Sequence, residues 1–114
     1  MTKYRKKIFN AAAIDLLNTI FSEVCTHFEA TLIEMDGEKD HVHLLIEYPP
    51  KLAISSLVNS LKGVSSRLLR KRLPGLANYY YKEVLWSPSY FAASCGGAPI
   101  SMVKQYIQQQ ATPN

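Results

Sequence analysis

Two histidines separated by one apolar residue are the first candidates for chemistry in this chain. His41 and His43 flank Val42 in a stretch where side chains of different polarity alternate. Alternation predicts a β-strand, in which successive side chains point to opposite faces, so both imidazoles share one face. Two imidazoles about 7 Å apart at Cα can hold a divalent cation. A pair of solvated histidines on a sheet face is the alternative that this motif alone favours.

A tyrosine and a glutamine near the end of the sequence form the second candidate pair. Tyr106 and Gln110 lie in residues 99–110, which follow two glycines and open on a proline. Proline suits the first turn of a helix, so this segment is predicted to be helical, with Tyr106 and Gln110 four residues apart on one face. Alone, a solvated helix face explains both residues. Beside the two histidines, however, a phenol and an amide oxygen outline a metal-assisted phosphoryl-transfer site.

The rest of the sequence predicts the elements that must position these side chains. Apolar residues recur at spacings of three and four in two segments, and strand-like patterns fill the stretches between them. We expect helices over residues 11–28 and 54–68, strands over 30–35 and 41–48 joined by a turn at 36–38, and strands over 79–86 and 90–93. This order predicts an α+β fold with helices packed on an antiparallel sheet.

Composition limits the class of protein. The 114 residues suffice for one domain, residues 1–114. Thirteen basic and nine acidic residues give a net charge of +4, which suits an anionic partner. Cys25 and Cys95 are too few for a disulfide scaffold, and no apolar run approaches the roughly 20 residues that span a membrane. The basic start lacks the apolar core of a signal peptide, so we expect a cytoplasmic protein.

The second predicted helix has a cationic side and end. Between Lys51 and Leu73 the sequence contains no acidic residue, so this surface is either a solvated charged face or a contact for phosphate backbones. The candidate DNA-binding residues are Lys62, Arg67, Arg70, Lys71 and Arg72. Trp86 and Tyr90 can stack on unpaired bases, but in strands such aromatics are more often core residues.

Motifs along nearly the whole chain resemble the insertion sequence 200 family of transposases, small tyrosine transposases of the His-hydrophobic-His nuclease superfamily. The matching residues are Thr2-Lys3-Tyr4-Arg5, Asp40-His41-Val42-His43-Leu44-Leu45, Leu61-Lys62-Gly63, Leu85-Trp86-Ser87-Pro88-Ser89-Tyr90-Phe91, Cys95-Gly96-Gly97-Ala98 and Val103-Lys104-Gln105-Tyr106-Ile107-Gln108-Gln109-Gln110. Each motif is weak alone, whereas the ordered set is specific.

The resemblance implies an enzyme that cuts and rejoins single-stranded DNA beside hairpins at the ends of a mobile element. Tyr106 would be the nucleophile that forms a 5′-phosphotyrosine. His41, His43 and Gln110 would be ligands of Mg²⁺ or Mn²⁺. Two neutral imidazoles and an amide oxygen are compatible with these cations and leave coordination positions open for phosphate and water. The resemblance also implies a homodimer with composite active sites, in which the tyrosine helix of one chain completes the histidine site of the other.

The same resemblance implies a ferredoxin-like fold, with one departure. Similar family members carry a hydrophobic strand before the Thr-Lys-Tyr-Arg motif, whereas this sequence begins at Met1. We therefore expect the first strand to be missing, and the exposed edge of the histidine strand to be covered by another copy or by a rearranged segment of this chain.

Other functions remain alternatives. A truncated, inactive transposase remnant would bind nucleic acid without chemistry. A zinc hydrolase would lack a clear third ligand near His41 and His43. A tyrosine transposase of dispersed palindromic repeats, a replication initiator or a relaxase would share the chemistry.

Overall fold

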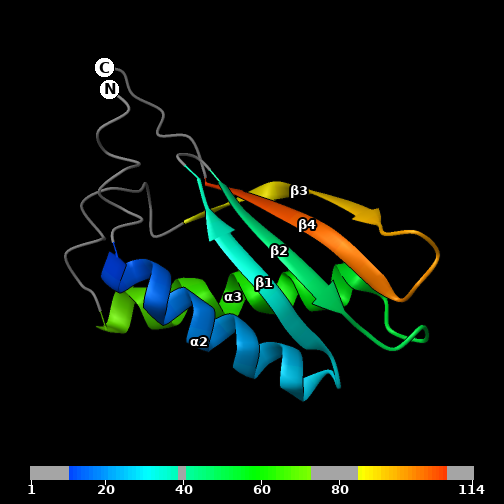
Figure 1. Ribbon diagram of the computed structural model, residues 1–114. Coiled ribbons are helices and arrows are strands. Elements are labelled where there is room, and N and C mark those ends of the chain that lie inside the picture. The colour runs from blue at the N-terminus through cyan, green and yellow to red at the C-terminus, as the bar shows by residue number, and fades with distance from the viewer. Residues whose placement is uncertain (1–10, 39–40, 73–84, 108–114) are drawn as a thin grey trace.

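A four-stranded sheet with two helices on one face forms the body of the protein (Figure 1). The computed structural model describes residues 11–38, 41–72 and 85–107. Its elements are α2 (Ala11–His27), β1 (Thr31–Gly37), β2 (His41–Glu47), α3 (Ile54–Arg72), β3 (Trp86–Ser94) and β4 (Ile100–Ile107). The predicted α+β class is confirmed. No helix in the described ranges is long and apolar enough to cross a membrane.

The sheet has the order β1-β2-β4-β3, and every neighbouring pair is antiparallel. β1 and β2 form the predicted hairpin, although Asp36 and Gly37 belong to β1 and pair with His43 and Val42. The turn predicted at residues 36–38 is therefore wrong for these two residues, because the strand pairing extends to the end of β1. The strand predicted over 90–93 lies within β3, while residues 79–84 fall outside the described part of the chain.

The core lies between the helices and the inner face of the sheet. Val42, Leu44 and Ile46 alternate along β2 and are completely buried, as the period-two pattern predicts. Leu17 and Phe21 of α2 and several leucines of α3 pack against them. Trp86 also belongs to this core and is 4% exposed, so it is a packing residue and has no surface for base stacking.

The C-terminal segment departs from the prediction. A helix was expected over residues 99–110, but Ile100–Ile107 form strand β4 between β2 and β3. Pairing on both sides satisfies the backbone groups of β4 and buries Val103 and Ile107. These tertiary contacts override the local helix signals, because propensity is a weak preference compared with sheet pairing and burial.

β4 also fills the edge of the histidine strand. It pairs along the full length of β2, from Ile100 opposite Glu47 to Tyr106 opposite His41. Of the two ways in which we expected this edge to be covered, the structure has the second, a segment of the chain itself.

Candidate functional site

The two histidines lie together on the outer face of the sheet, the face opposite the helices. Because Val42 points into the core, His41 and His43 point outward, and both are partly buried. Their rings stack with centroids 4.7 Å apart, and their Nε2 atoms are 2.8 Å apart. At that distance one ring N–H donates to the lone pair of the other ring. The strand therefore brings the two imidazoles to one point, as the sequence predicted.

Tyr106 joins this pair from the neighbouring strand. It stands directly opposite His41 in the pairing of β2 with β4, and the centroids of the two rings are 5.4 Å apart. The sequence predicted a tyrosine at this site but on a helix. In the structure, strand pairing brings Tyr106 close to His41, because residues opposite each other in an antiparallel pair have neighbouring side chains on the same face.

The spacing of the two histidine nitrogens is one that two ligands of a single divalent cation can have. Two nitrogens at about 2.1 Å from a metal, in adjacent coordination positions, are separated by about 3 Å, close to the observed 2.8 Å. Within residues 11–38, 41–72 and 85–107, no three His, Cys, Asp or Glu side chains come together as a metal site. His41 and His43 would thus hold a cation together with oxygen ligands from elsewhere. The predicted third ligand, Gln110, lies outside the described residues.

Charged side chains flank the histidines across the sheet. Asp36 of β1 stands opposite His43 on one side, and Lys104 of β4 stands opposite it on the other. The Lys104 ammonium also lies 5.9 Å from the centroid of the Phe91 ring. Asp36 and Lys104 could not be singled out from local sequence patterns, because their proximity to His43 depends on strand register. Extending the predicted hairpin by two residues would have placed Asp36 opposite His43.

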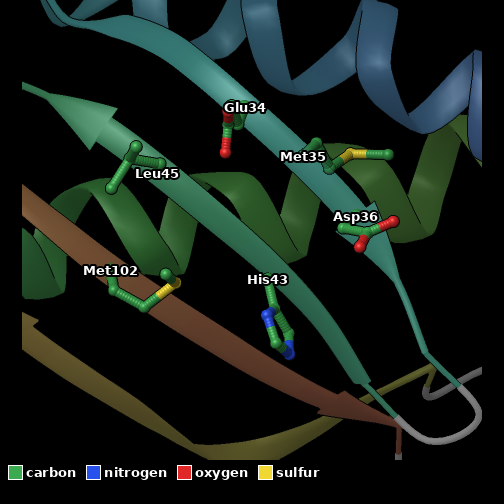
Figure 2. Close-up of a pocket in the computed structure, with 6 residues that line it drawn as sticks. All are labelled: Glu34, Met35, Asp36, His43, Leu45 and Met102. Carbon is green, nitrogen blue, oxygen red and sulfur yellow. The ribbon is translucent and has the colours of Figure 1, made fainter.

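A hollow of about 460 Å³ adjoins His43 on this face. Figure 2 shows the side chains around it, which come from β1, β2 and β4. The lining residues are Glu34, Met35, Asp36, His43, Leu45 and Met102. Acidic groups thus border the hollow on the β1 side, whereas the tyrosine and Lys104 lie on the β4 side of the histidines.

The cationic residues of α3 do not all have the same surroundings. Arg67, Lys71 and Arg72 are exposed, and Arg70 donates to the Ser66 hydroxyl at 3.0 Å. In Figure 1 the C-terminal end of α3 lies toward the same end of the molecule as the start of β2 and the end of β4, but in the helix layer. A strand of nucleic acid reaching both regions would have to pass around the end of the sheet.

Lys62 is directed toward β3. Its ammonium donates to the Pro88 carbonyl at 2.8 Å and lies 5.4 Å from the centroid of the Tyr90 ring. Burial lowers the pKa of Lys62, because the surrounding protein disfavours its charged form. These contacts give Lys62 a role in joining α3 to β3, and they occupy the ring of Tyr90, which the sequence left open as a stacking surface.

Comparisons with known proteins show related sequences along nearly the whole chain. Residues 1–110 match the family model described as "Transposase IS200 like". The transposase for insertion sequence element IS200 of Salmonella typhimurium is 29% identical over 108 residues, which cover 95% of this chain and 70% of that protein. The ISDra2 transposase TnpA of Deinococcus radiodurans is 31% identical over 108 residues, covering 95% of this chain and 77% of that protein. The chain therefore belongs to the family of IS200-like transposases.

Proposed function

We propose that this transposase cuts and rejoins single-stranded DNA at the ends of its element through a covalent 5′-phosphotyrosine on Tyr106. His41 and His43 hold Mg²⁺ or Mn²⁺ in this proposal. The observation that carries it is the cluster on the outer sheet face, where two imidazole nitrogens 2.8 Å apart lie beside the Tyr106 ring. Family membership supports it, since the similar proteins are transposases.

The proposed cleavage exchanges one phosphodiester for another. The phenolic oxygen of Tyr106 bonds to the scissile phosphorus as the bond from phosphorus to the 3′ oxygen breaks. The phenol loses its proton to solvent, and the departing oxygen gains one to become a 3′-hydroxyl. A 3′-hydroxyl can later attack the phosphotyrosine and reverse the exchange, so rejoining requires no nucleotide cofactor. A bound divalent cation supplies positive charge that polarises the phosphate and stabilises charge developing on its oxygens.

Cationic side chains around the site provide the affinity for DNA in this proposal. Lys104 lies next to His43 and suits the scissile phosphate. Arg67, Lys71 and Arg72 are exposed on α3 and suit phosphates farther along the strand. Such contacts recognise the backbone without reading sequence, and their affinity falls with increasing salt.

The decisive experiment is a search for the covalent adduct. The full chain is incubated with single-stranded DNA carrying the hairpin end of the element, with Mn²⁺ or with EDTA, and then analysed by denaturing electrophoresis. The DNA is labelled at its 3′ end, because the fragment retained on the tyrosine carries the 5′ phosphate. We expect a labelled protein band that requires Mn²⁺ and disappears in Tyr106→Phe.

Tyr90→Phe is the matched control. Tyr90 lies on the helix side of the same sheet, where it packs against the core, so this variant should keep the adduct. An adduct that persists in Tyr106→Phe would refute the assignment of the nucleophile. DNA binding without any adduct, in a folded protein, would favour the alternative of an inactive binding remnant.

The homodimer is a separate part of the proposal. In the described chain Tyr106 lies beside His41 of its own β2, so one chain can supply both the nucleophile and the histidines. Light scattering after size-exclusion chromatography measures the mass directly. Mixing Tyr106→Phe with His43→Ala then tests for composite sites, because only exchange of tyrosines between chains would restore the adduct.

A further inference from the structure

Phe91 is a large apolar side chain that lies in solvent on the outer face of the sheet. It stands opposite Lys104 in the pairing of β3 with β4, and it is 51% exposed. Within the described ranges, Ile33 of the other edge strand is the large apolar residue with comparable exposure. Single exposed apolar side chains are ordinary on protein surfaces, so the position of Phe91, and not its exposure, has to indicate what it does.

The ring of Phe91 stands in line with the candidate site. Strand pairing places Phe91, Lys104 and His43 side by side across β3, β4 and β2. Adjacent strands are about 4.8 Å apart, so the backbone of Phe91 lies roughly 10 Å from that of His43. A single nucleotide, measured from its phosphate to the far edge of its base, can span such a distance. A phosphate held near the histidines therefore has its own base or a neighbouring base within reach of the ring.

An apolar row of side chains runs beside this polar row. Ala93, Met102 and Leu45 pair across the same three strands and share the outer face. Ala93 is exposed, and its small side chain leaves that flank of the Phe91 ring open. The outer face thus offers an ammonium and imidazoles in one row and apolar surface in the next. A nucleotide has matching parts, because its phosphate is anionic and its base has a π face that stacks on aromatic rings.

The contact with Lys104 leaves the ring of Phe91 available. The Lys104 ammonium lies 5.9 Å from the ring centroid, near the roughly 6 Å limit of a cation–π contact. Its stem is flexible and the ammonium has three donors, so Lys104 can bind a phosphate while a base covers the ring. Tyr90 differs, because it packs against the core and beside the Lys62 ammonium. Of these two adjacent aromatic residues, Phe91 is the one whose ring is exposed to solvent.

Charge on the outer face favours the same side of the site for the DNA backbone. Glu34 and Asp36 of β1 border the hollow on the other side of His43. Both carboxyl groups are exposed and repel phosphates, whereas Lys104 attracts them. We therefore expect a strand bound at the histidines to run toward β3, over Phe91, and away from β1.

We propose that Phe91 is a stacking surface for an unpaired base of the DNA strand, and that Lys104 binds the phosphate next to that base. Stacking uses the face of the base, so this contact tolerates any sequence. A base inside a duplex is already stacked on its neighbours, so the contact favours single strands. The inference rests on the proposed function, which brings single-stranded DNA to this face, but it does not depend on the covalent step at Tyr106.

Two probes separate the contribution of the base from that of the phosphate. One is a fluorescein-labelled oligothymidylate, and the other is a labelled strand of the same length whose sugars carry no bases. Both are titrated with the full chain in EDTA, which prevents metal-dependent cleavage, and binding is followed by fluorescence anisotropy. We expect Phe91→Ala to weaken binding of the oligothymidylate about tenfold and to leave binding of the abasic strand unchanged. Lys104→Gln should weaken binding of both strands, because both carry phosphates.

Three variants serve as controls. Phe91→Tyr keeps an aromatic face and should bind the oligothymidylate like the wild-type chain. Phe91→Leu keeps apolar bulk without an aromatic ring, so it should lose affinity as Phe91→Ala does, and it replaces Phe91→Ala if alanine prevents folding. Ile33→Ala removes the exposed apolar side chain of the other edge strand and should leave binding of both strands unchanged.

Three results would overturn the proposal. In the first, Phe91→Ala binds the oligothymidylate as tightly as the wild-type chain does. In the second, the wild-type chain binds the oligothymidylate no more tightly than the abasic strand. In the third, Phe91→Ala has a lower mass than the wild-type chain in light scattering, which would assign the ring to a contact with a second copy of the chain.

The outcome is separable from that of the adduct experiment. Base-dependent binding through Phe91 without any adduct would support the stacking surface and refute the proposed chemistry. An adduct formed by the wild-type chain, together with unchanged affinity in Phe91→Ala, would do the opposite.

Discussion

The hydrogen bond between Trp86 and Ser65 offers a quantitative test of how β3 is attached to α3. The indole nitrogen of Trp86 donates to the Ser65 hydroxyl at 2.8 Å, and that hydroxyl in turn donates to the Leu61 carbonyl. Ser65 is completely buried and Trp86 is 4% exposed. Ser65→Ala removes the hydroxyl while leaving the helix backbone and the indole in place.

The expected loss of stability in Ser65→Ala is the difference between two free-energy contributions. Removing one partner of a buried hydrogen bond costs about 1–3 kcal/mol. Alanine favours the helix over serine by about 0.5 kcal/mol, so the free energy of unfolding should fall by about 0.5–2.5 kcal/mol. For a chain of 114 residues, 1 kcal/mol corresponds to a change of roughly 4 °C in Tm. Ser65→Ala should therefore melt roughly 2–10 °C below the wild-type chain.

Urea unfolding followed by far-UV circular dichroism measures this loss. The midpoint should fall with an unchanged m-value, because the surface exposed on unfolding stays the same. Ser55→Ala, at an exposed position of α3, controls for helix propensity and should change stability by less than about 0.5 kcal/mol. A double-mutant cycle with Trp86→Phe isolates the interaction. A midpoint equal to that of Ser55→Ala, together with no coupling in the cycle, would refute this reasoning.

Four further predictions concern cysteine reactivity, the pH dependence of stability, two glycines and metal binding. Iodoacetamide should modify the exposed Cys95 quickly and the buried Cys25 slowly, as mass spectrometry of a time course would show. Burial raises the pKa of Cys25 from 9.0 to about 11. The contribution of its protonated thiol is therefore fully present below pH 9 and lost as the pH rises through about 11, so Cys25→Ala should reduce the loss of stability in that window. Gly63→Ala, in open space within α3, should stabilise by about 0.5–1 kcal/mol. Gly97→Ala, at a φ of 79°, should destabilise by about 1–2 kcal/mol, and equal effects in urea unfolding would contradict this contrast. His43→Ala should weaken Mn²⁺ binding about tenfold or more in calorimetric titration, whereas unchanged affinity would exclude the histidine pair as the metal site.

Local sequence patterns predicted those parts of the fold in which burial follows one regular period. The apolar spacing of α2 and α3 and the alternation of Val42, Leu44 and Ile46 each have one interpretation, because a single face meets the core. The two histidines could be placed together for the same reason. Trp86 remained ambiguous, since its location in the core depends on Ser65, 21 positions earlier, and on packing that no local pattern encodes.

Strand β4 shows where local reasoning fails. Its sequence has the signals of a helix, and only the open edge of β2, a feature distant in sequence, explains why it pairs as a strand. Proximity of Tyr106 to His41 follows from that pairing. Asp36 and Lys104 likewise become neighbours of His43 only through register, which depends on the whole sheet.

The position of β4 also determines the order in which the protein can be assembled. It lies in the middle of the sheet but comes last among the described elements. Its pairs with β2 join residues separated by 53 positions, for Glu47 and Ile100, to 65 positions, for His41 and Tyr106. Pairs between residues this far apart in sequence form slowly. During synthesis, the hairpin of β1 and β2 therefore has an unpaired edge on β2 until β4 has been made. A nascent chain therefore exposes a surface prone to association with other chains. The tyrosine reaches the histidines only when the last strand is in place, so no partly made chain carries the assembled cluster.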